Sequence, residues 1–507
     1  MTIISKFSRL AAGVSLAALS AATVASAQPL ANPLMVPTLR GDAVEPVQSE
    51  GNFLRPRIGL QAAVTDNVNR SSTNKQSDAL ARATVGLAAQ YDSPRAQANV
   101  TGDVIYDVYA KNQKYDTLSF NGAATATYVV IPQVLAFDAA GFNTQGSAST
   151  FGSTEFYRGA NPADYQISSY YVGPHLAISP AIVDLSAAAR FGQTFFDGSN
   201  VAGLQPLADS TSFYQLIGAA DTKNRLGRVR FVTSGQYQQD DQDFESTSGS
   251  VSTFFQATDR ATGILRLGYD DTKLSSTMRL EEPFWAVGGQ FVFANASFFR
   301  IEGGRRYDRP YWAGQAQYRA SRRLMLVADY MSVLETGAIA VNSVLVDYVG
   351  DLNEPLPLPN LQGGFRLNTN YFDQAAINRT GNVRAMIDLD KQTIVFQLTS
   401  SEQKFLSVAG SFQTMAQSVT YANQVRPDLS LSLGFTHATG RYKGAILTGR
   451  SDRDGNFYQT TAQAEYGLNS RTKLTAAYQN RRSRPGGTTI VDSFDENVGS
   501  ISILRQF

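Results

Sequence analysis

Polar and apolar residues alternate along most of the chain, from Arg57 to Phe507. In the stretch Leu80–Tyr91, one face carries Ala81, Ala83, Val85, Leu87, Ala89 and Tyr91. Alternation predicts β-strands, because successive side chains of a strand point to opposite faces. The alternating stretches reach about ten residues or more, the length that crosses a bilayer at a tilt. Strands of soluble sandwiches also alternate, but they are shorter, about five or six residues.

Two kinds of connection separate these stretches and take turns along the chain. The short ones are Asp92–Pro94, Ile131–Gln133, Ser179–Ala181, Asp221–Arg225, Thr258–Arg260, Asn295–Ala296, Ala320–Arg322, Asp388–Lys391, Asn423–Asp428 and Asn469–Arg471. The long ones are Val68–Ser77, Asn143–Tyr165, Asp197–Ser210, Gln238–Ser250, Glu335–Arg379, His437–Gly455 and Arg484–Asp492. Outer-membrane barrels have short periplasmic turns and longer outer loops, whereas a soluble sandwich gives no reason for this regularity.

The fold class predicted from these patterns is all-β, a transmembrane antiparallel β-barrel of about 22 strands (roughly 18 to 24). A sheet in lipid must close, because every backbone N–H and C=O needs a partner. The alternation is weakest at Phe244–Thr258, Ser275–Arg309 and Leu406–Tyr421. Composition agrees with a barrel, since 23 Tyr and 29 Phe suit aromatic girdles.

The N-terminal segment has the pattern of a secretory signal. Lys6 and Arg9 precede an uncharged apolar stretch, and Ala25–Ala27 supplies a small-residue cleavage site. We therefore predict a cleaved signal peptide over residues 1–27 and an extended periplasmic leader over residues 28–52. The barrel is predicted to occupy residues 53–507. The leader carries several prolines and is too short for a folded plug domain.

Charge and residue counts exclude several kinds of chemistry. Lys and Arg total 44 against 43 Asp and Glu, so no nucleic-acid partner is expected. The chain has no cysteine, which excludes disulfides and zinc–thiolate sites. The two histidines are His175, in a predicted strand, and His437, at a predicted loop edge. We predict no catalytic residues, no metal ligands and no cofactor, and hence no enzyme.

Arginine outnumbers lysine, and six arginines fall on the polar register of predicted strands. They are Arg82, Arg190, Arg266, Arg300, Arg319 and Arg384. If these side chains line an open lumen, they favour the passage of anions. The alternative is that they pair with acidic residues of the same register and brace the wall. The acidic candidates are Asp103, Asp107, Asp184, Asp329, Asp388, Glu302 and Glu465.

Two further segments suggest roles of their own. The loop Glu335–Arg379 is the longest and contains the proline-rich piece Glu354–Pro359. One hypothesis is that this loop folds into or over the pore, and the other is that it stays on the surface. The chain ends at Phe507 with apolar residues alternating behind it, which resembles the assembly signal that outer-membrane proteins present to the barrel assembly machinery.

The region Phe53–Tyr109 resembles the start of the beta-barrel porin 2 family. The residues that carry the resemblance are Pro56–Leu60, Thr65–Val68, Ser77–Asp78 and Val85–Leu87. The resemblance implies an outer-membrane barrel without enzymatic activity. Because members are similar to proteins found with exopolysaccharide systems, it also implies the passage of polysaccharide.

Two functions remain open at this level. The first is a porin-like channel, located in the outer membrane and surrounded by its lipid, that passes an anionic oligo- or polysaccharide. The second is a structural or surface-interaction barrel whose lumen is closed by side chains and loops. A barrel of this strand number has a wide interior unless something fills it.

Overall fold

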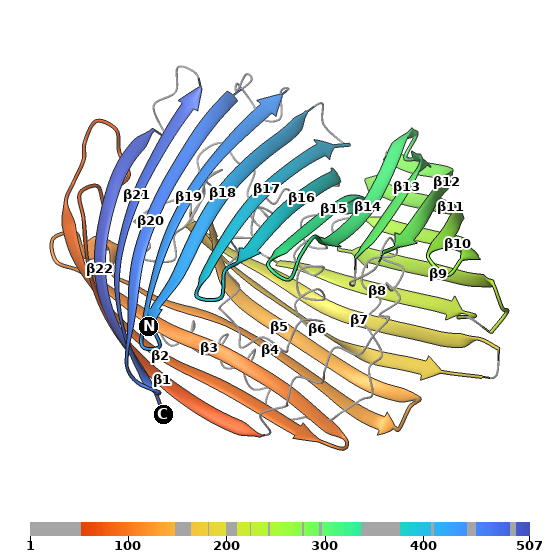
Figure 1. Cartoon of the computed structure of the whole chain (residues 1–507), viewed down its shortest axis with the longest axis horizontal. Helices are drawn as coiled ribbons and strands as arrows, with labels where there is room; N and C mark the ends of the chain where they lie inside the picture. The colour runs from red at the N-terminus through yellow and green to blue at the C-terminus, as the bar shows by residue number, and fades with distance from the viewer. Residues whose placement is uncertain are drawn as a thin grey trace.

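The fold is a single closed antiparallel barrel of 22 strands (Figure 1). The computed structural model describes residues 52–147, 164–180, 182–198, 210–223, 225–241, 244–275, 278–293, 297–335, 376–406, 410–443, 453–486 and 493–507. The predicted signal peptide and nearly all of the predicted leader lie outside these residues. Among the described residues, no helix is long and apolar enough to cross a bilayer.

The strands follow one another with a single turn of 3-10 helix, η1 (Gln113–Tyr115), between the third and fourth. The first eleven are β1 (Phe53–Thr65), β2 (Asp78–Ser93), β3 (Ala96–Tyr109), β4 (Thr117–Ile131), β5 (Leu135–Ser147), β6 (Asp164–Ile178), β7 (Asp184–Gly198), β8 (Ser210–Asp221), β9 (Val229–Asp240), β10 (Glu245–Thr258) and β11 (Ala261–Ser275). The second eleven are β12 (Met278–Val292), β13 (Phe298–Arg306), β14 (Arg309–Arg319), β15 (Leu324–Glu335), β16 (Ala376–Asp388), β17 (Gln392–Phe405), β18 (Ser411–Arg426), β19 (Leu429–Lys443), β20 (Arg453–Asn469), β21 (Thr472–Gly486) and β22 (Phe494–Gln506).

The barrel closes where its two ends meet. β1 pairs with β2 on one side and with β22 on the other, in a continuous antiparallel register from Arg57–Gln506 to Thr65–Val498. Closure leaves the sheet without a free first or last strand, which is the condition for a sheet in lipid. The predicted fold class and the predicted strand number are therefore confirmed.

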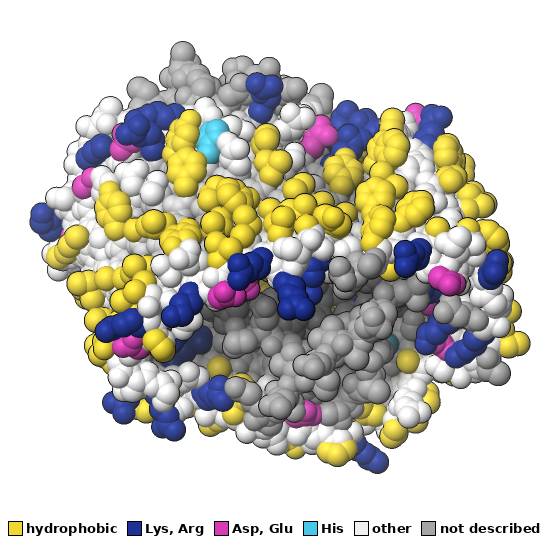
Figure 2. Space-filling model, in the orientation of Figure 1, with side chains coloured by type: hydrophobic (Ala, Val, Ile, Leu, Met, Phe, Trp, Pro, Cys, Tyr) yellow, Lys and Arg dark blue, Asp and Glu magenta, His cyan; other side chains and the backbone are white. Residues whose placement is uncertain are grey.

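The described strands have one apolar, exposed face and one face that is less exposed. In β1, Leu54, Ile58, Leu60 and Val64 are exposed, whereas Ala63 between them is 4 % exposed. We call the exposed apolar side the outer face and the opposite side the inner face. Hydrophobic side chains gather in a band across the outer surface (Figure 2). A band of this kind is what a barrel presents to the hydrocarbon of a bilayer.

Nine of the ten predicted short connections mark a boundary between strands, although Asn423–Arg426 still belongs to β18. The tenth, Asn295–Ala296, lies outside the described residues. The predicted long connections agree only in part. The prediction of a loop at Gln238–Ser250 was wrong, because β9 ends at Asp240 and β10 begins at Glu245. The prediction of His437 at a loop edge was also wrong, because β19 continues to Lys443. The longest predicted loop, Glu335–Arg379, lies almost wholly outside the described residues, so its hypothesised fold over the pore stays a prediction.

Candidate functional site: the inner wall

The inner wall is held by ion pairs that cross from strand to strand. Arg57 of β1 and Asp103 of β3 flank Gly86 of β2 in one row of the sheet. The Arg57 Nε and Nη2 atoms donate to the two Asp103 carboxylate oxygens at 2.7 and 2.8 Å. The pair can close over β2 because Gly86 has no side chain. A Cβ atom at Gly86 would lie 2.0 Å from Asp103 Oδ1.

Two more forked pairs brace the wall between neighbouring strands. Arg82 donates to both oxygens of Asp107 at 2.7 and 2.9 Å, and Asp107 is fully buried. Arg230 donates to both oxygens of Asp221 in the same manner, with its Nε at 2.8 Å. Such bidentate pairs fix the geometry as well as neutralise the charges.

A denser cluster covers the inner face of β11 to β13. Arg266 and Arg300 share one carboxylate, that of Glu302, at 3.1 Å (Arg266 Nη2) and 2.9 Å (Arg300 Nε). Arg306 donates to both oxygens of Asp270 at 2.6 and 2.8 Å. These five side chains are all at most 7 % exposed. Three arginines therefore face two carboxylates in this cluster.

Aromatic rings support the same arginines. The guanidinium carbons of Arg230 and Arg300 lie 5.5 and 5.7 Å from the ring centre of Phe254. That of Arg306 lies 4.4 Å from the ring centre of Phe284. Rings in this position attract a cation through their quadrupole. The inner wall here is therefore rigid, basic and aromatic.

The six sequence-predicted arginines fall into two groups, although all lie on the inner register. Arg82, Arg266 and Arg300 are ion-paired, and the buried Arg190 donates to the Gln215 amide oxygen at 3.1 Å and lies 5.1 Å from the Tyr171 ring centre. Arg319 and Arg384 are exposed, and neither forms an ion pair with any residue that the structure describes. That the six arginines line an open lumen stays a prediction.

Sequence reasoning missed several arginines that carry the network. They are Arg57, Arg70, Arg230, Arg306 and Arg481. The alternation itself could have pointed to Arg57. Its side chain is on the same face of β1 as Ala63, and Ile58 and Leu60 are on the other, exposed face. Arg70 could not be found this way, because it belongs to a connection and has φ of 47°.

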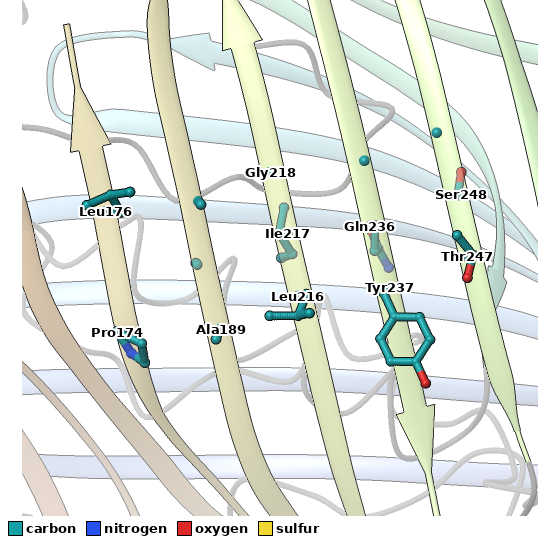
Figure 3. Close-up of a pocket in the computed structure, with 14 residues that line it drawn as sticks. Pro174, Leu176, Ala189, Leu216, Ile217, Gly218, Gln236, Tyr237, Thr247 and Ser248 are labelled. Atoms are coloured by element: carbon teal, nitrogen blue, oxygen red, sulfur yellow. The ribbon is translucent and has the colours of Figure 1, made fainter.

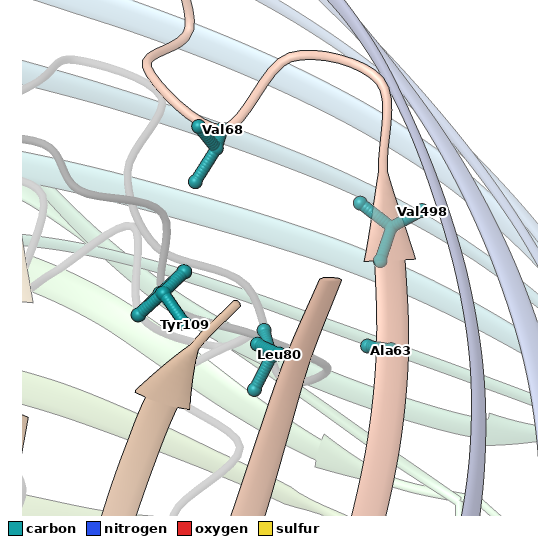
Figure 4. Packing of buried hydrophobic residues seen from close by; sticks show 5 residues of the cluster. All are labelled: Ala63, Val68, Leu80, Tyr109 and Val498. Atoms are coloured by element: carbon teal, nitrogen blue, oxygen red, sulfur yellow. The ribbon is translucent and has the colours of Figure 1, made fainter. Parts of the chain in front are cut away.

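The connection between β1 and β2 folds inward. Val68 is fully buried against the inner-face residues Ala63, Leu80, Tyr109 and Val498 (Figure 4). Asn67, also fully buried, donates from Nδ2 to the backbone oxygens of Ser71 and Asp495 at 2.8 Å each. This connection therefore lies against the inside of the wall rather than standing out from it.

Charged groups hold the inward connection in place. Glu496 is fully buried and contacts Arg481 at 2.6 Å and Arg70 at 3.6 Å, while the Thr65 hydroxyl donates to it at 3.0 Å. Asp78 accepts hydrogen bonds from the backbone N–H groups of Ala79, Lys111 and Asn112. Of the motif residues, Asn67 thus holds its connection to β22, and Asp78 of β2 holds the start of the connection between β3 and β4.

The two histidines lie apart on opposite faces. His175 is on the inner face of β6, with Nδ1 3.6 Å from Asp138 Oδ2. His437 is on the outer face of β19, stacked on Tyr458 with 4.6 Å between ring centres. Among the described residues, no three His, Asp or Glu side chains gather in a way that could hold a metal ion.

A shallow groove crosses the outer face rather than the interior (Figure 3). Its floor is a row of small residues on neighbouring strands, Ala187, Gly218, Gly235 and Gly249. Leu216 and Tyr237 form one border. The groove lies within the apolar band and so belongs to the surface that meets lipid.

Comparison with known proteins gives the fold but no family. No family model matches the chain, and no curated protein matches it. Among solved structures, the chain is similar to a mutant of the ferric enterobactin receptor PfeA from Pseudomonas aeruginosa, with a TM-score of 0.52 at 8 % identity. The match covers 90 % of this chain and 81 % of the receptor. The chain therefore has the fold of an outer-membrane β-barrel.

Two other solved structures match with lower scores. The siderophore receptor PirA from Acinetobacter baumannii gives a TM-score of 0.48 at 8 % identity, over 89 % of this chain and 80 % of that one. OccK2 from P. aeruginosa gives 0.36 at 10 % identity, over 90 % of this outer-membrane barrel and all of OccK2.

Proposed function

We propose that this barrel is a channel for anionic solutes, with acidic oligo- or polysaccharides as the cargo class. The observation that carries the proposal is the placement of Arg319 and Arg384. Both lie on the inner register, both are exposed, and no described residue forms an ion pair with either. An exposed cation on a channel wall raises the local concentration of anions and so favours their passage.

The two arginines lie near each other at the short-turn end of the barrel. Arg319 is the last residue of β14 and pairs in register with Met325 of β15, and Arg384 of β16 pairs with Val327 of the same strand. One strand therefore separates them. Because short turns face the periplasm in such barrels, we place this positive charge at the periplasmic mouth.

The short motif in Phe53–Tyr109 resembles the beta-barrel porin 2 family, although no family model matches the chain. That resemblance agrees with the proposal. It implies polysaccharide as the cargo, and acidic sugars are the polysaccharides that an arginine-bearing mouth favours. We further propose that the aromatic C-terminus at Phe507 is the contact with the barrel assembly machinery. No catalytic step, metal or cofactor belongs to the proposed function.

The second candidate is a structural barrel with a closed interior. Two features favour it. The connection that carries Val68 folds into the interior, and the buried ion pairs take up part of the space along the inner face. The two functions differ in one observable, since a closed barrel conducts no ions.

The test is single-channel recording of refolded residues 28–507 in planar bilayers, with selectivity taken from the reversal potential in a salt gradient. We expect stable conductance steps with anion preference. Replacing Arg319 and Arg384 by Glu should abolish or reverse that preference. The control is Arg305→Glu at an exposed residue of the outer register, which matches each of the two replacements made singly, because each changes the charge by two units.

The recordings separate the open channel from the closed barrel and test the cargo class. Folded protein without conductance would favour the closed structural barrel. Conductance with cation preference in the wild-type chain would overturn the proposed cargo class. An equal effect of the control substitution would show that the reversal potential reports overall charge rather than the two arginines.

A further inference from the structure

At its loop end, the barrel wall separates between β14 and β15. β4 and β5 separate there as well, since among the described residues Thr117–Asn121 of β4 pairs with β3 alone and Thr144–Ser147 of β5 pairs with β6 alone. β14 and β15 pair only from Gly314 to Arg319 with Met325 to Tyr330, which is six residue pairs. The β12–β13 pairing, also short, has eight. From Arg309 to Ala313, β14 pairs with β13 alone among the described residues. β15 meanwhile continues with β16 as far as Glu335 and Ala376. The wall therefore separates into two hairpins at its loop end.

A free strand edge is costly where it faces hydrocarbon, because its backbone groups have no water to bond. The edge of β14 reduces this cost in one respect, since Pro310 has no N–H and prolines suit edge strands. Trp312 in the same segment is exposed on the outer face. Tryptophan marks the membrane–water interface in barrels. The division therefore opens at the level of the lipid headgroups.

The top of the β15–β16 hairpin leans into the barrel. Leu334 and Ile377 lie on the outer register, yet they are buried in one cluster with Phe244 of the β9–β10 connection. Leu280, on the inner register of β12, packs against the same cluster, as do Tyr307 and Leu406. An outer-register residue can meet an inner-register one only if its hairpin bends across the rim. This inward bend is what separates β15 from β14.

Tyr307 fills the division. Tyr307 and Asp308 form the two-residue turn between β13 and β14, with φ of 55° and 51°. A turn with two positive φ angles normally uses Asn and Gly, because a Cβ is strained there. Tyr307 packs against the cluster of Phe244, Leu334 and Ile377, and its hydroxyl lies near the Leu334 backbone. The Arg306 guanidinium lies 4.9 Å from the ring centre. A strained residue is kept here by these contacts.

The surroundings of the division suit an amphiphile with a negative head. The rim cluster is buried in this structure, and its apolar surface becomes accessible to an acyl chain only when the hairpin top leaves it. Beside it, Arg309 pairs in register with Arg306 on the inner face, and no described residue forms an ion pair with Arg309. Arginine binds carboxylate and phosphate groups through paired hydrogen bonds. Apolar surface and an unneutralised arginine therefore stand together at the opening.

We propose that the division between β14 and β15 is a lateral opening, latched by Tyr307. Through it, the acyl chain of an anionic amphiphile passes between the outer leaflet and the barrel interior. Unlatching requires the β15–β16 hairpin top to leave the rim cluster, which widens the division at the headgroup level. This activity goes beyond the proposed channel and does not depend on it, because it requires no ion conductance.

The wild-type barrel allows the first test. It is reconstituted in bilayers containing either a phosphatidylglycerol with a photoactivatable diazirine acyl chain or a diazirine-bearing palmitate. After irradiation, adducts are located by peptide mass spectrometry. We expect inner-face adducts beside the division, at Gln315 and Val327, and none at Thr84 and Asn99 on the inner face of β2 and β3. Which probe labels shows whether a bilayer lipid or a free fatty acid is the source.

Outer-face adducts on all strands serve as the internal measure of probe access. If inner-face residues of both walls are labelled equally, the lipid enters through the mouth and the proposal fails. If no inner-face residue is labelled while the outer face is, the division does not open, and the proposal also fails. Ion conductance measured on the same protein reports on the channel separately.

The latch is tested in a chain that contains no native cysteine. Tyr307→Cys with Leu334→Cys, bridged by a short reducible thiol linker, should abolish inner-face labelling, and reduction should restore it. The matched control is Ala316→Cys with Ala328→Cys. These residues face each other in the part of β14 and β15 that is already paired, so a disulfide between them should leave the labelling unchanged. Tyr307→Ala should raise it. Labelling that persists in the bridged protein would refute the latch.

Discussion

Replacing Gly86 by alanine tests whether ion pairs hold the inner wall. The new Cβ would lie 2.0 Å from Asp103 Oδ1, 2.6 Å from Arg57 Nε and 2.8 Å from Arg57 Cγ. These distances require the pair to open. Asp103 is 3 % exposed, so its carboxylate would remain buried without its partner. Losing one partner of a buried pair costs about 3–5 kcal/mol.

The net effect should be smaller than that cost for two reasons. The Arg57 side chain is 19 % exposed, so water solvates part of the separated guanidinium. Alanine is also favoured over glycine inside a strand by about 0.5–1 kcal/mol. We therefore expect Gly86→Ala to lower the free energy of unfolding by about 2–3 kcal/mol.

Equilibrium unfolding of the refolded barrel in urea measures this change. The matched control is Gly249→Ala on β10, where a Cβ would meet nothing within 4 Å. That substitution should leave the stability unchanged or raise it by up to about 1 kcal/mol. A control loss as large as that of Gly86→Ala would mean that any side chain in these strands is disruptive.

A double-mutant comparison then isolates the pair. Gly86→Ala is repeated in a chain that already carries Arg57→Ala and Asp103→Ala. Because the pair no longer exists there, its cost should fall below about 1 kcal/mol. An equal cost in both backgrounds would refute the reasoning, since the strain would then come from the backbone around Gly86.

Four further substitutions separate the roles of buried and exposed groups. Asn67→Ala should release the inward connection, measured as faster proteolysis between β1 and β2, because the Asn67 amide holds two backbone oxygens; unchanged cleavage would contradict this role. Glu302→Gln should lower the free energy of unfolding in urea by about 3–5 kcal/mol, since it leaves the buried Arg266 and Arg300 without the carboxylate that they share. An unchanged stability would mean that other groups balance the charge of these two arginines. Arg82→Ala should lower stability without changing ion selectivity, because it removes the partner of the buried Asp107, whereas Arg384→Ala should change selectivity without lowering stability; the reverse pattern would exchange the two roles.

The strands could be predicted from the sequence because lipid and interior impose a period of two. Leu54, Ile58 and Leu60 meet hydrocarbon, and the residues between them do not. The tight turns could be predicted as well, since turn residues such as those at Asp92–Pro94 interrupt the alternation. Both signals are local and therefore visible in a single chain.

One predicted loop was wrong for a physical reason. Gln238, Asp240 and Ser248 are polar, and a run of polar residues near the end of a strand resembles a loop. In the barrel they lie on the inner face, where polarity is the rule, and Ser248 accepts a hydrogen bond from Arg306 at 3.2 Å. Sequence polarity cannot separate a loop from the polar inner face of a strand.

The ion pairs lay beyond prediction because they depend on register. Both members of the Arg82–Asp107 pair were candidates, yet nothing local to either residue says that they face each other. The Arg57–Asp103 pair spans three strands and also requires Gly86 between them. Such a contact follows only from the stagger of the strands, which is set by the closure of the whole barrel.

The distribution of charge on the inner face separates stability from selectivity. Where an arginine is paired and buried, as Arg82 and Arg306 are, its charge is cancelled within a few ångströms and contributes little field to the interior. The exposed Arg319 and Arg384 at one end, and Arg309 at the other, have no ion-pair partner among the described residues. Buried arginines that are not fully balanced by carboxylates, Arg190 and the cluster of Arg266, Arg300 and Arg306, add a positive background. The exposed arginines near the two mouths are the ones that an anion can contact directly, while the paired arginines hold the wall.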